Sequence, residues 1–366
     1  MLNSKAFVSR QSKPLRKTSL FVGLYTFQGE KNMKKIITLL LSIVLSTMAL
    51  FVSACASKPD ALKVNIKYYA NGDIVVDAII GGSEKIGLVA EPDASELEAN
   101  YLEQTGKALY RLDLQELYDG DTKAYPQAVL MVKKNVLSAN PNLISALETK
   151  ITQSVSWVKQ NVATAVETLN AKGGTLDAGT LTDKSIDGCK IYWENAQNSK
   201  TSVKNYIDKI VEIDSTKASA VADDFFYLEA NGTPSQKSAY TFMVPDGAPA
   251  IAIAKLINDN DALGTGKTIN YSVIKANQVV PNLSSGTPDF IIAPVNLASK
   301  LYKANGNDYV MVSVITHGNF YILSTTEITV NDLKGKQVAV PNQGAVPDWT
   351  FKMVLDKNSL LYTTVE

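Results

Sequence analysis

Few residues in this 366-residue sequence could carry catalysis. It has a single histidine, His317 in ITHGNF, and two cysteines, Cys55 and Cys189. The spacings HExxH and GxSxG do not occur, and two cysteines so far apart form no CxxC metal site. Cys189 stands alone in DGCKIYW and is expected to be a buried small hydrophobe, since a nucleophile would need a partner base. The sequence therefore predicts no catalytic residue, no metal and no cofactor.

The net charge favours export over nucleic-acid binding. The chain balances 36 Lys and Arg against 36 Asp and Glu, but residues 1–54 hold 8 basic residues and 1 acidic residue. The part after Cys55 is therefore acidic, with a net charge of −7. Phosphate backbones and anionic membrane surfaces both attract basic patches, so this part predicts neither as a partner.

The start of the chain reads as an export signal. Met33-Lys34-Lys35 precedes a 17-residue apolar run, residues 36–52, and VSAC ends at Cys55. VSAC resembles a bacterial lipobox, which implies that Cys55 is acylated and anchors the protein on the extracytoplasmic face of the membrane. An uncleaved membrane-spanning helix is the competing interpretation, because 17 residues is near the lower limit for a span. Residues 1–32 are interpreted as an extended basic region or as translation from an upstream start.

After this signal, strands and helices alternate. Short apolar runs bounded by turn residues predict strands buried on both faces of parallel sheets. The longest expected helix covers 141–170, and the polar segment EANGTPSQKSA at 229–239 has the chemistry of a linker. Strands are expected at 63–69, 86–90, 107–113, 127–133, 240–244, 269–274, 289–293, 309–315, 319–324 and 337–341, and further helices at 178–187, 199–213, 249–259 and 346–358.

One segment of this sequence occurs twice in similar form. GTPDFIIAPVN at 286–296 has a degraded echo in GSEKIGLVAEP at 82–92, and an Ala-Asn pair precedes each copy. Each copy reads as a strand, a helix, a small-residue turn, a buried strand and a proline-bearing loop. The echo predicts two similar α/β lobes, although unrelated strand–helix units also share composition.

Six segments together carry a family resemblance: YTFMVPDGAPAIAIAKL, GTPDFIIAPVNLASKLY, THGNFYILS, DLKGKQVAVPNQGAVPDWTFKMVL, ANGDIVVDAIIGGSEKIGLVAEP and YPQAVLMVKKN. Together they resemble the substrate-binding lipoprotein of an ABC importer, of the nitrate, sulfonate, taurine or thiamine-precursor type. The resemblance implies an α/β fold of the type II periplasmic-binding-protein kind, with a ligand cleft between two lobes and a membrane permease as partner.

The order of these segments differs from the family order, because the later half of the family pattern precedes the earlier half. We interpret the chain as a circular permutant, and a rearranged chain that no longer folds is the alternative. Termini of compact domains often lie close together, which makes permutation tolerable. One lobe is then expected to comprise 60–175 and 319–366, with the new ends inside it. The other lobe comprises 176–318, including the linker 229–239, and 1–54 lies outside the fold.

Ligands of open α/β sheets bind where strands end and helices begin. For Gly247 and Gly344 the alternative is a tight turn, for Asn296 a helix N-cap, and for Tyr125 core packing. Glu91, a carboxylate at a strand end among apolar neighbours, requires a donor from a ligand or from the protein. The strand ends nominate Asp246, Gly247, Ala248, Asn296, Gln343, Gly344, Ala345 and Glu91, and the resemblance adds His317, Gly318, Asn319 and Tyr125.

The ligand class stays open between two candidates. The resemblance implies a sulfonate-like anion, but Arg111 is the only arginine after Cys55, and it falls on a strand. Acidic residues near the expected cleft favour an amine-bearing heterocycle instead. Two other function classes are weighed: an enzyme like those of thiamine-precursor synthesis, which the export signal disfavours, and a surface adhesion or signalling lipoprotein.

Overall fold

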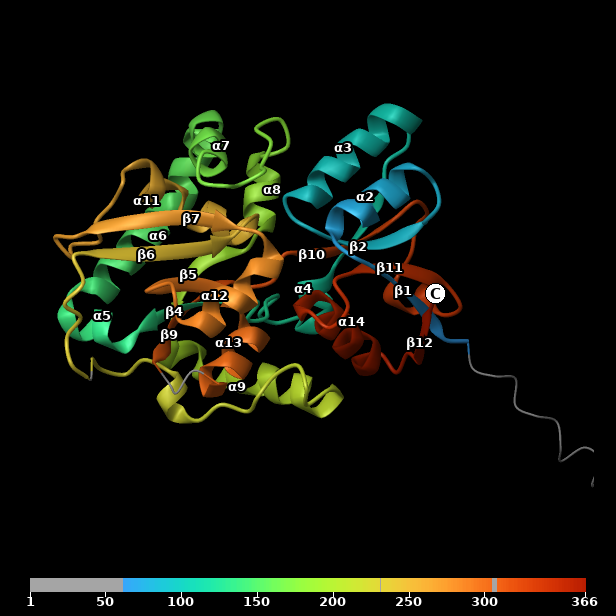
Figure 1. Ribbon diagram of the computed structural model, residues 1–366. Helices are drawn as coiled ribbons and strands as arrows, with labels where there is room; N and C mark the ends of the chain where they lie inside the picture. The colour runs from blue at the N-terminus through green and yellow to red at the C-terminus, as the bar shows by residue number, and fades with distance from the viewer. Residues whose placement is uncertain (1–61, 231, 305–307) are drawn as a thin grey trace, which may run out of the picture. The chain divides into compact units, whose positions relative to one another are not determined.

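The computed structural model describes residues 62–230, 232–304 and 308–366, with the side chains of 303 and 304 left out. The predicted signal and the predicted lipid attachment at Cys55 lie outside this range. The described residues form two lobes, each built on its own six-stranded sheet (Figure 1). The fold is therefore a two-lobed α/β architecture, as the sequence predicts. Across these residues, no helix is both long and apolar enough to cross a membrane.

Lobe 1 contains both ends of the described chain. Its strand order is β12-β1-β11-β2-β10-β3, and all neighbours are parallel except at β10, which runs against β2 and β3. Helices α2 and α3 cover one face, and α4 and α14 cover the other. The strands are β1 Val64–Tyr69, β2 Ile86–Ala90, β3 Tyr110–Asp113, β10 Phe320–Ser324, β11 Gln337–Pro341 and β12 Tyr362–Val365; the helices are α2 Gly72–Ile80, α3 Asp93–Thr105, α4 Leu114–Tyr118 and α14 Val346–Lys357.

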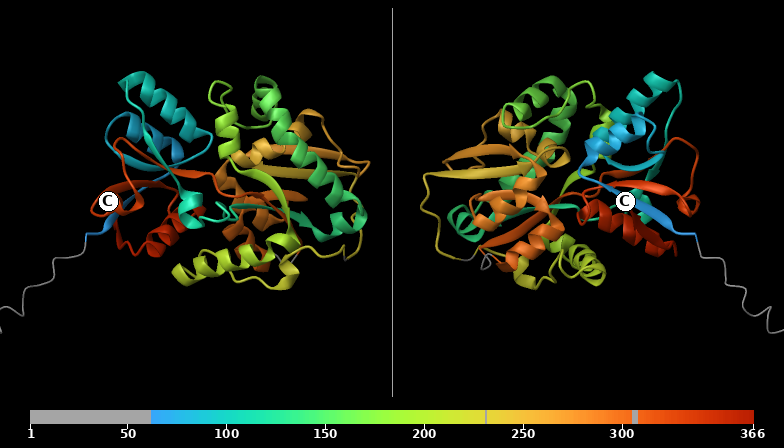
Figure 2. Two further views of the ribbon diagram at one scale, coloured as in Figure 1. Left: turned by 180° about the vertical axis from the view of Figure 1, so that it is seen from behind. Right: turned by 45° about the vertical axis from the view of Figure 1, so that its right-hand side comes forward.

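Lobe 2 has the strand order β5-β9-β4-β8-β6-β7. Helices α6, α7, α10 and α11 cover one face, and α9, α12 and α13 cover the other (Figure 2). The strands are β4 Ala128–Lys133, β5 Ile191–Asn195, β6 Ala239–Pro245, β7 Thr268–Ile274, β8 Phe290–Pro294 and β9 Tyr309–Thr316; the helices are α5 Lys134–Ala139, α6 Leu143–Gln160, α7 Val162–Asn170, α8 Asp183–Gly188, α9 Ala196–Ile213, α10 Ala248–Ala252, α11 Ala254–Asn258, α12 Val279–Ser285 and α13 Val295–Ala304.

The double cover explains the composition of the strands. All eight residues of β9 and all five of β10 are buried, as are the first four of β8. A strand with helices on both faces has no solvent side, so its sequence is continuously apolar and does not alternate. This is why runs such as FIIAP and FYILS identify central strands so directly.

Two chain crossings connect the lobes. One runs from α4 to β4 through residues 119–127, and the other runs from β9 to β10 through residues 317–319. The crossings are hydrogen-bonded to each other, because the Tyr125 N–H donates to the His317 carbonyl at 3.2 Å and the Gln127 N–H to the Thr316 carbonyl at 3.0 Å. These two segments are therefore the places where a change in the angle between the lobes would be absorbed.

Three sequence-based expectations need correction. The lobe boundary expected at 175 lies instead in the first crossing, because β4 pairs with β8 and β9 of lobe 2. The expected helix 141–170 is two helices that break at Asn161. Strands β5 and β12 were missed, since their partly exposed residues lack a continuous apolar run.

The C-terminal segment completes the lobe that begins the described chain. Strand β11 pairs in parallel with β1, with Ile66 opposite Val338, and β12 pairs with the other edge of β1. The expectation that 337–341 shares a sheet with 63–69 and 86–90 is confirmed. The echoed segments also end in matching strands, β2 in lobe 1 and β8 in lobe 2, each preceded by a glycine with positive φ (Gly82 and Gly286).

Deleting residues 346–366 should unfold lobe 1 instead of merely shortening the chain. The deletion removes Phe351, Val354 and Leu355, which are fully buried in the lobe 1 core. A single Phe-to-Ala truncation in a core costs about 3–5 kcal/mol, and this deletion removes several such side chains. Hydrogen exchange should show lost protection in β1 and β2.

A proteolytic cut within 229–239 serves as the control, because most of the described residues of that segment are exposed. The two pieces should stay associated and keep their protected amides. Retained protection in β1 after the 346–366 deletion would contradict the pairing described above.

Candidate functional site

A cavity of about 810 Å³ lies between the two lobes. It forms where the carboxyl ends of β1, β2 and β11 in lobe 1 meet those of β6, β7 and β8 in lobe 2. In open α/β sheets this edge is where ligands bind, because loops and helix N-termini leave backbone groups free there. Lobe 1 contributes Tyr68, Tyr69, Ala70, Ala90, Glu91, Pro92, Asp93, Asn319, Phe320 and 342–347, and lobe 2 contributes Gln127, Ala128, 245–249, Ala276, Asn277, Pro294 and Leu297.

The two copies of the echoed sequence meet at this cavity. Ala70 and Ala276, from the Ala-Asn pairs that precede the copies, both line it. Pro92 and Pro294, from the proline-bearing loops that follow the two buried strands, line it as well. The echo thus reflects two equivalent strand–helix–strand units, one in each lobe. The carboxyl ends of the strands of both units line the same cavity.

Most residues nominated from strand ends do line the cavity. Asp246, Gly247 and Ala248 follow β6, and Gln343, Gly344 and Ala345 lie between β11 and α14. Gly247 has φ 87° and Gly344 has φ 76°, so both glycines also serve as the turn residues that the alternative interpretation expected. Glu91 and Asn319 complete the nominated residues that reach the cavity.

Four nominated residues lie elsewhere. His317, Gly318 and Tyr125 belong to the crossings, and Asn296 is buried at the start of α13. None of the four lines the cavity in the described part of the chain. The Asn296 side chain donates from Nδ2 to the Lys217 carbonyl at 3.3 Å, so it tethers a loop of lobe 2.

His317 is a packing residue of the second crossing. Its ring stacks on Tyr192 with centroids 3.4 Å apart, and Nε2 lies 3.2 Å from Glu194 Oε2. Burial lowers the pKa of His317 despite the neighbouring carboxylate. A buried imidazole in this position holds the crossing against β5 and does not face the cavity.

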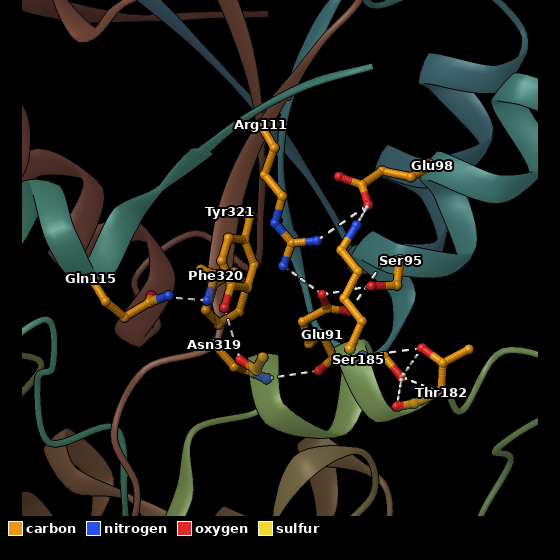
Figure 3. Close-up of polar contacts among 12 residues, drawn as sticks. Glu91, Ser95, Glu98, Arg111, Gln115, Thr182, Ser185, Asn319, Phe320 and Tyr321 are labelled. Carbon is orange, nitrogen blue, oxygen red and sulfur yellow. Dashed lines mark hydrogen bonds and ion pairs between the residues drawn. The ribbon is translucent and has the colours of Figure 1, made fainter. Parts of the chain in front are cut away.

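The donor that Glu91 required comes from the protein. Glu91 Oε1 lies 2.5 Å from Arg111 Nη2, and the Ser95 hydroxyl donates to the same oxygen at 2.8 Å (Figure 3). The Ser95 N–H donates to the other oxygen at 3.1 Å. The Glu91 side chain is fully buried, so its charge is balanced within lobe 1 and is not offered to a ligand.

The same residues fix Asn319. Its Nδ2 donates to the Glu91 carbonyl oxygen at 2.8 Å, which leaves Oδ1 as the free end of the amide (Figure 3). Asn319 is 4% exposed, and within the described structure its Oδ1 has no hydrogen-bond partner. Gln127, from the first crossing, also lines the cavity, and its Oε1 likewise has no hydrogen-bond partner among the described residues. Both atoms are hydrogen-bond acceptors that lack a donor.

Asp93 is the carboxylate that the sequence analysis missed. It follows Pro92 as the first residue of α3 and lines the cavity. No salt bridge or hydrogen bond to its side chain occurs among the described residues. Burial raises the pKa of Asp93 to about 7, and the nearby carboxylates of Asp73, Glu96, Glu91 and Asp246 contribute to the same shift.

Asp246 faces the cavity from lobe 2 but is already satisfied. Its Oδ2 accepts from the Thr175 N–H at 2.8 Å and from the Thr175 hydroxyl at 2.7 Å. Its Oδ1 accepts from the Gly247 N–H at 2.9 Å. It therefore adds negative potential to the cavity and supports the turn after β6. No lysine or arginine appears in the cavity lining that the structure describes.

Comparison with known proteins gives partial matches only. No family model matches this chain, and no curated protein does. Among solved structures, NikA from Brucella suis with Fe(III)-EDTA is 10% identical, with 76% of this chain and 59% of that chain covered and a TM-score of 0.33. The oligopeptide-binding protein AppA from Bacillus subtilis, in complex with a nonapeptide, is 10% identical over 72% and 56% of the two chains, with a TM-score of 0.32.

A periplasmic oligopeptide-binding protein of an ABC transporter from Thermotoga maritima gives a third match. It is 11% identical over 70% of this chain and 55% of that chain, with a TM-score of 0.33. This chain thus spans little more than half the length of the three proteins.

Gly318→Ala should destabilise the protein strongly. Gly318 has φ 87°, and a Cβ there would sit 2.6 Å from both Gln115 Cγ and Tyr125 Cε1. Backbone strain of about 1–2 kcal/mol and overpacking of about 1–3 kcal/mol would add, for a loss of about 2–5 kcal/mol in urea unfolding. Gly106→Ala is the matched control, because its φ is 68° but nothing lies within 4 Å of its Cβ. An equal loss in both variants would mean that packing at the crossing contributes nothing.

Asp93→Asn should stabilise the ligand-free protein in a pH-dependent way. The folded pKa of about 7 lies above the ordinary value of about 3.9, so ionised Asp93 opposes folding. This cost is absent below about pH 4, grows as the pH rises toward 7 and is complete above it. The variant's advantage in free energy of unfolding should therefore increase between pH 5 and pH 8. Asp121→Asn, which removes an exposed carboxylate, should give no such trend; an identical trend would contradict the burial argument.

Proposed function

We propose that this protein is an extracytoplasmic solute-binding protein that captures a small molecule in the interlobe cavity and delivers it to an ABC importer. The observation that carries the proposal is the cavity itself, which both lobes line with their strand ends. Two adjacent, hydrogen-bonded crossings connect the lobes, an arrangement that permits hinge closure around a ligand. Six sequence segments that resemble the nitrate, sulfonate, taurine and thiamine-precursor type lie in these two lobes.

The protein acts by binding and not by catalysis in this proposal. The described lining of the cavity contains no cysteine, histidine, serine or lysine, so nucleophilic catalysis through those side chains has no candidate there. The ligand classes that the sequence nominated, a sulfonate-like anion and an amine-bearing heterocycle, are both small enough for such a space. Cys55 is the proposed lipid anchor, and the permease is the proposed partner.

We also infer that the chain is a circular permutant of this fold. Strands β11 and β12, from the C-terminal end, flank β1 in parallel, as a cut within lobe 1 requires. Residues 229–239, the proposed junction of the former termini, lie between η2 (Asp223–Phe225) and β6, and most of the described ones are exposed. The exposed junction and the completed lobe 1 sheet both support a permuted chain that folds.

Ligand binding should compact the protein. Small-angle scattering of residues 56–366 should give a smaller radius of gyration with a ligand found by a thermal-shift panel of nitrate, taurine, alkanesulfonates, aminopyrimidines and amino acids. A ligand at about 100 times its Kd raises stability by about 2.7 kcal/mol, which is readily detected as a shift in Tm.

Ala70→Trp should abolish both the ligand-dependent compaction and the rise in Tm. Ala70 is exposed at the cavity wall, and an indole there would occupy the space of the ligand. Ala220→Trp places the same side chain at an exposed position outside the cavity lining and should keep both responses. Unchanged radii at saturation, or equal behaviour of the two variants, would contradict closure on a ligand in this cavity.

A further inference from the structure

The cavity is short of hydrogen-bond donors and rich in acceptors. Asp93 and Asn319 of lobe 1 and Gln127 of the first crossing all line it. Asn319 Oδ1 and Gln127 Oε1 are buried atoms with no partner in the described structure. Asp93, Asn319 and Gln127 thus line one cavity with a carboxylate and two amide oxygens that have no donors among the described residues, a set complementary to a ligand that brings several N–H groups.

The charge of the lining has one sign. Asp93 and Asp246 face the cavity from opposite lobes, and Arg111, the only arginine after Cys55, is occupied by Glu91 and Glu98. Arg111 also lies over the Tyr321 ring, 3.5 Å from its centroid. A bound cation would relieve the repulsion between the two aspartates, whereas a bound anion would add to it.

Three aromatic residues, Tyr68, Tyr69 and Phe320, line the cavity. The Tyr68 hydroxyl donates to Asp348 at 2.9 Å and the Tyr69 hydroxyl to Glu84 at 2.7 Å, so both rings are held by their polar ends. Phe320 adds a third ring to the lining. Aromatic faces attract cations and stack on planar groups, which suits a delocalised nitrogen cation.

An anionic ligand would need different residues. The ammonium of Lys217 lies at one end of the cavity, with Nζ 3.4 Å from the point that a Gly344 Cβ would occupy. Lys217 and the first amides of α14 could together receive an acid group at that end of the cavity. An anion bound there would leave the acceptors on Asn319 and Gln127 without donors, which makes this alternative less complementary.

We propose that the ligand is a small planar organic cation with adjacent N–H donors, such as a protonated amidine, guanidine or aminoheterocycle, and that Asp93, Asn319 and Gln127 receive those donors. This inference rests on the proposed solute-binding function and names its substrate class. It places at Asp93 the ligand contact for which Glu91 was one of the candidates.

The test uses probes of one shape and different charge. Benzamidine is a planar cation with N–H donors, benzamide is its neutral counterpart, and benzoate and benzenesulfonate are anions. Thermal shift and calorimetry with residues 56–366 should give binding of benzamidine and of other cations in a wider panel of small solutes, and weaker or no binding of neutral and anionic members.

Two variants test whether the ligand binds at the Asp93 end or at the Lys217 end of the cavity. Asp93→Asn should weaken cation binding about tenfold or more, because it removes a charge-assisted hydrogen bond. Lys217→Gln and the exposed control Asp121→Asn should leave cation affinity unchanged. An anionic ligand would give the opposite pattern, with a loss in Lys217→Gln only.

Cation affinity should also rise with pH. The groups around Asp93 are Asp73 of α2, Glu96 of α3, Glu91 after β2 and Asp246 of lobe 2, and all are acids that favour its protonated form. An acid with a pKa of about 7 is about one-tenth ionised at pH 6 and about nine-tenths ionised at pH 8, so the affinity should increase about tenfold over that range. The Asp93→Asn variant should lose this dependence.

The outcomes are distinguishable. Cation binding that depends on Asp93 supports the inference. Binding of anions or neutral solutes only, or cation binding that is unaffected in Asp93→Asn, overturns the inference but leaves the solute-binding function intact. If no solute of any charge binds, the proposed function fails and the ligand inference fails with it.

Discussion

Strand β11 is the constraint on which lobe 1 depends. It lies between β1 and β2, so the last part of the chain is inserted between the first two strands of the sheet. Parallel neighbours cannot be joined by a tight turn, and the sheet cannot close until the C-terminal segment is in place. The loop after β11 and the start of α14 reach the cavity for the same reason. The Asn342 N–H donates to the Tyr69 carbonyl and Tyr68 donates to Asp348, which joins the two strand ends at the cavity wall.

The second determinant is the buried ion pair of Glu91 and Arg111. An ionised carboxylate at full burial is tolerated only when it is paired and hydrogen-bonded, and Arg111 and Ser95 together meet that condition. The pair removes from the cavity the one guanidinium that could have bound an anion. It also positions the Glu91 backbone oxygen that orients the Asn319 amide. The ion pair thereby sets both the electrostatic sign and one specific acceptor of the cavity.

The sequence predicts the position of the cavity better than the roles of its side chains. Strand ends are visible as apolar runs followed by Pro, Gly or Asn, and this pattern placed Asp246, Gln343 and Gly344 correctly on the wall. It could not show that Arg111, twenty residues from Glu91, would neutralise that carboxylate, because the pairing depends on β3 lying beside β10. The roles of His317 and Tyr125 could not be predicted for a similar reason. Each lies next to a buried strand in the sequence, as the cavity residues do, but both lie where the chain passes between the lobes.

Several of the buried polar side-chain atoms that lack a partner among the described residues lie near the cavity or the crossings, whereas others, on Trp193, Asn296 and Tyr302, lie within lobe 2. Two of them, Asn319 Oδ1 and Gln127 Oε1, belong to residues that line the cavity, where a ligand could supply the donors. Three further atoms lie at or beside the crossings: Tyr125 Oη, His317 Nδ1 and, in α4 just before the first crossing, Gln115 Nε2. Buried groups without partners lower stability, so a fold selected for rigidity alone would satisfy or replace them. A protein that closes on a ligand needs incomplete interactions in both places, because the cavity must gain contacts on binding and the crossings must rearrange without a large barrier.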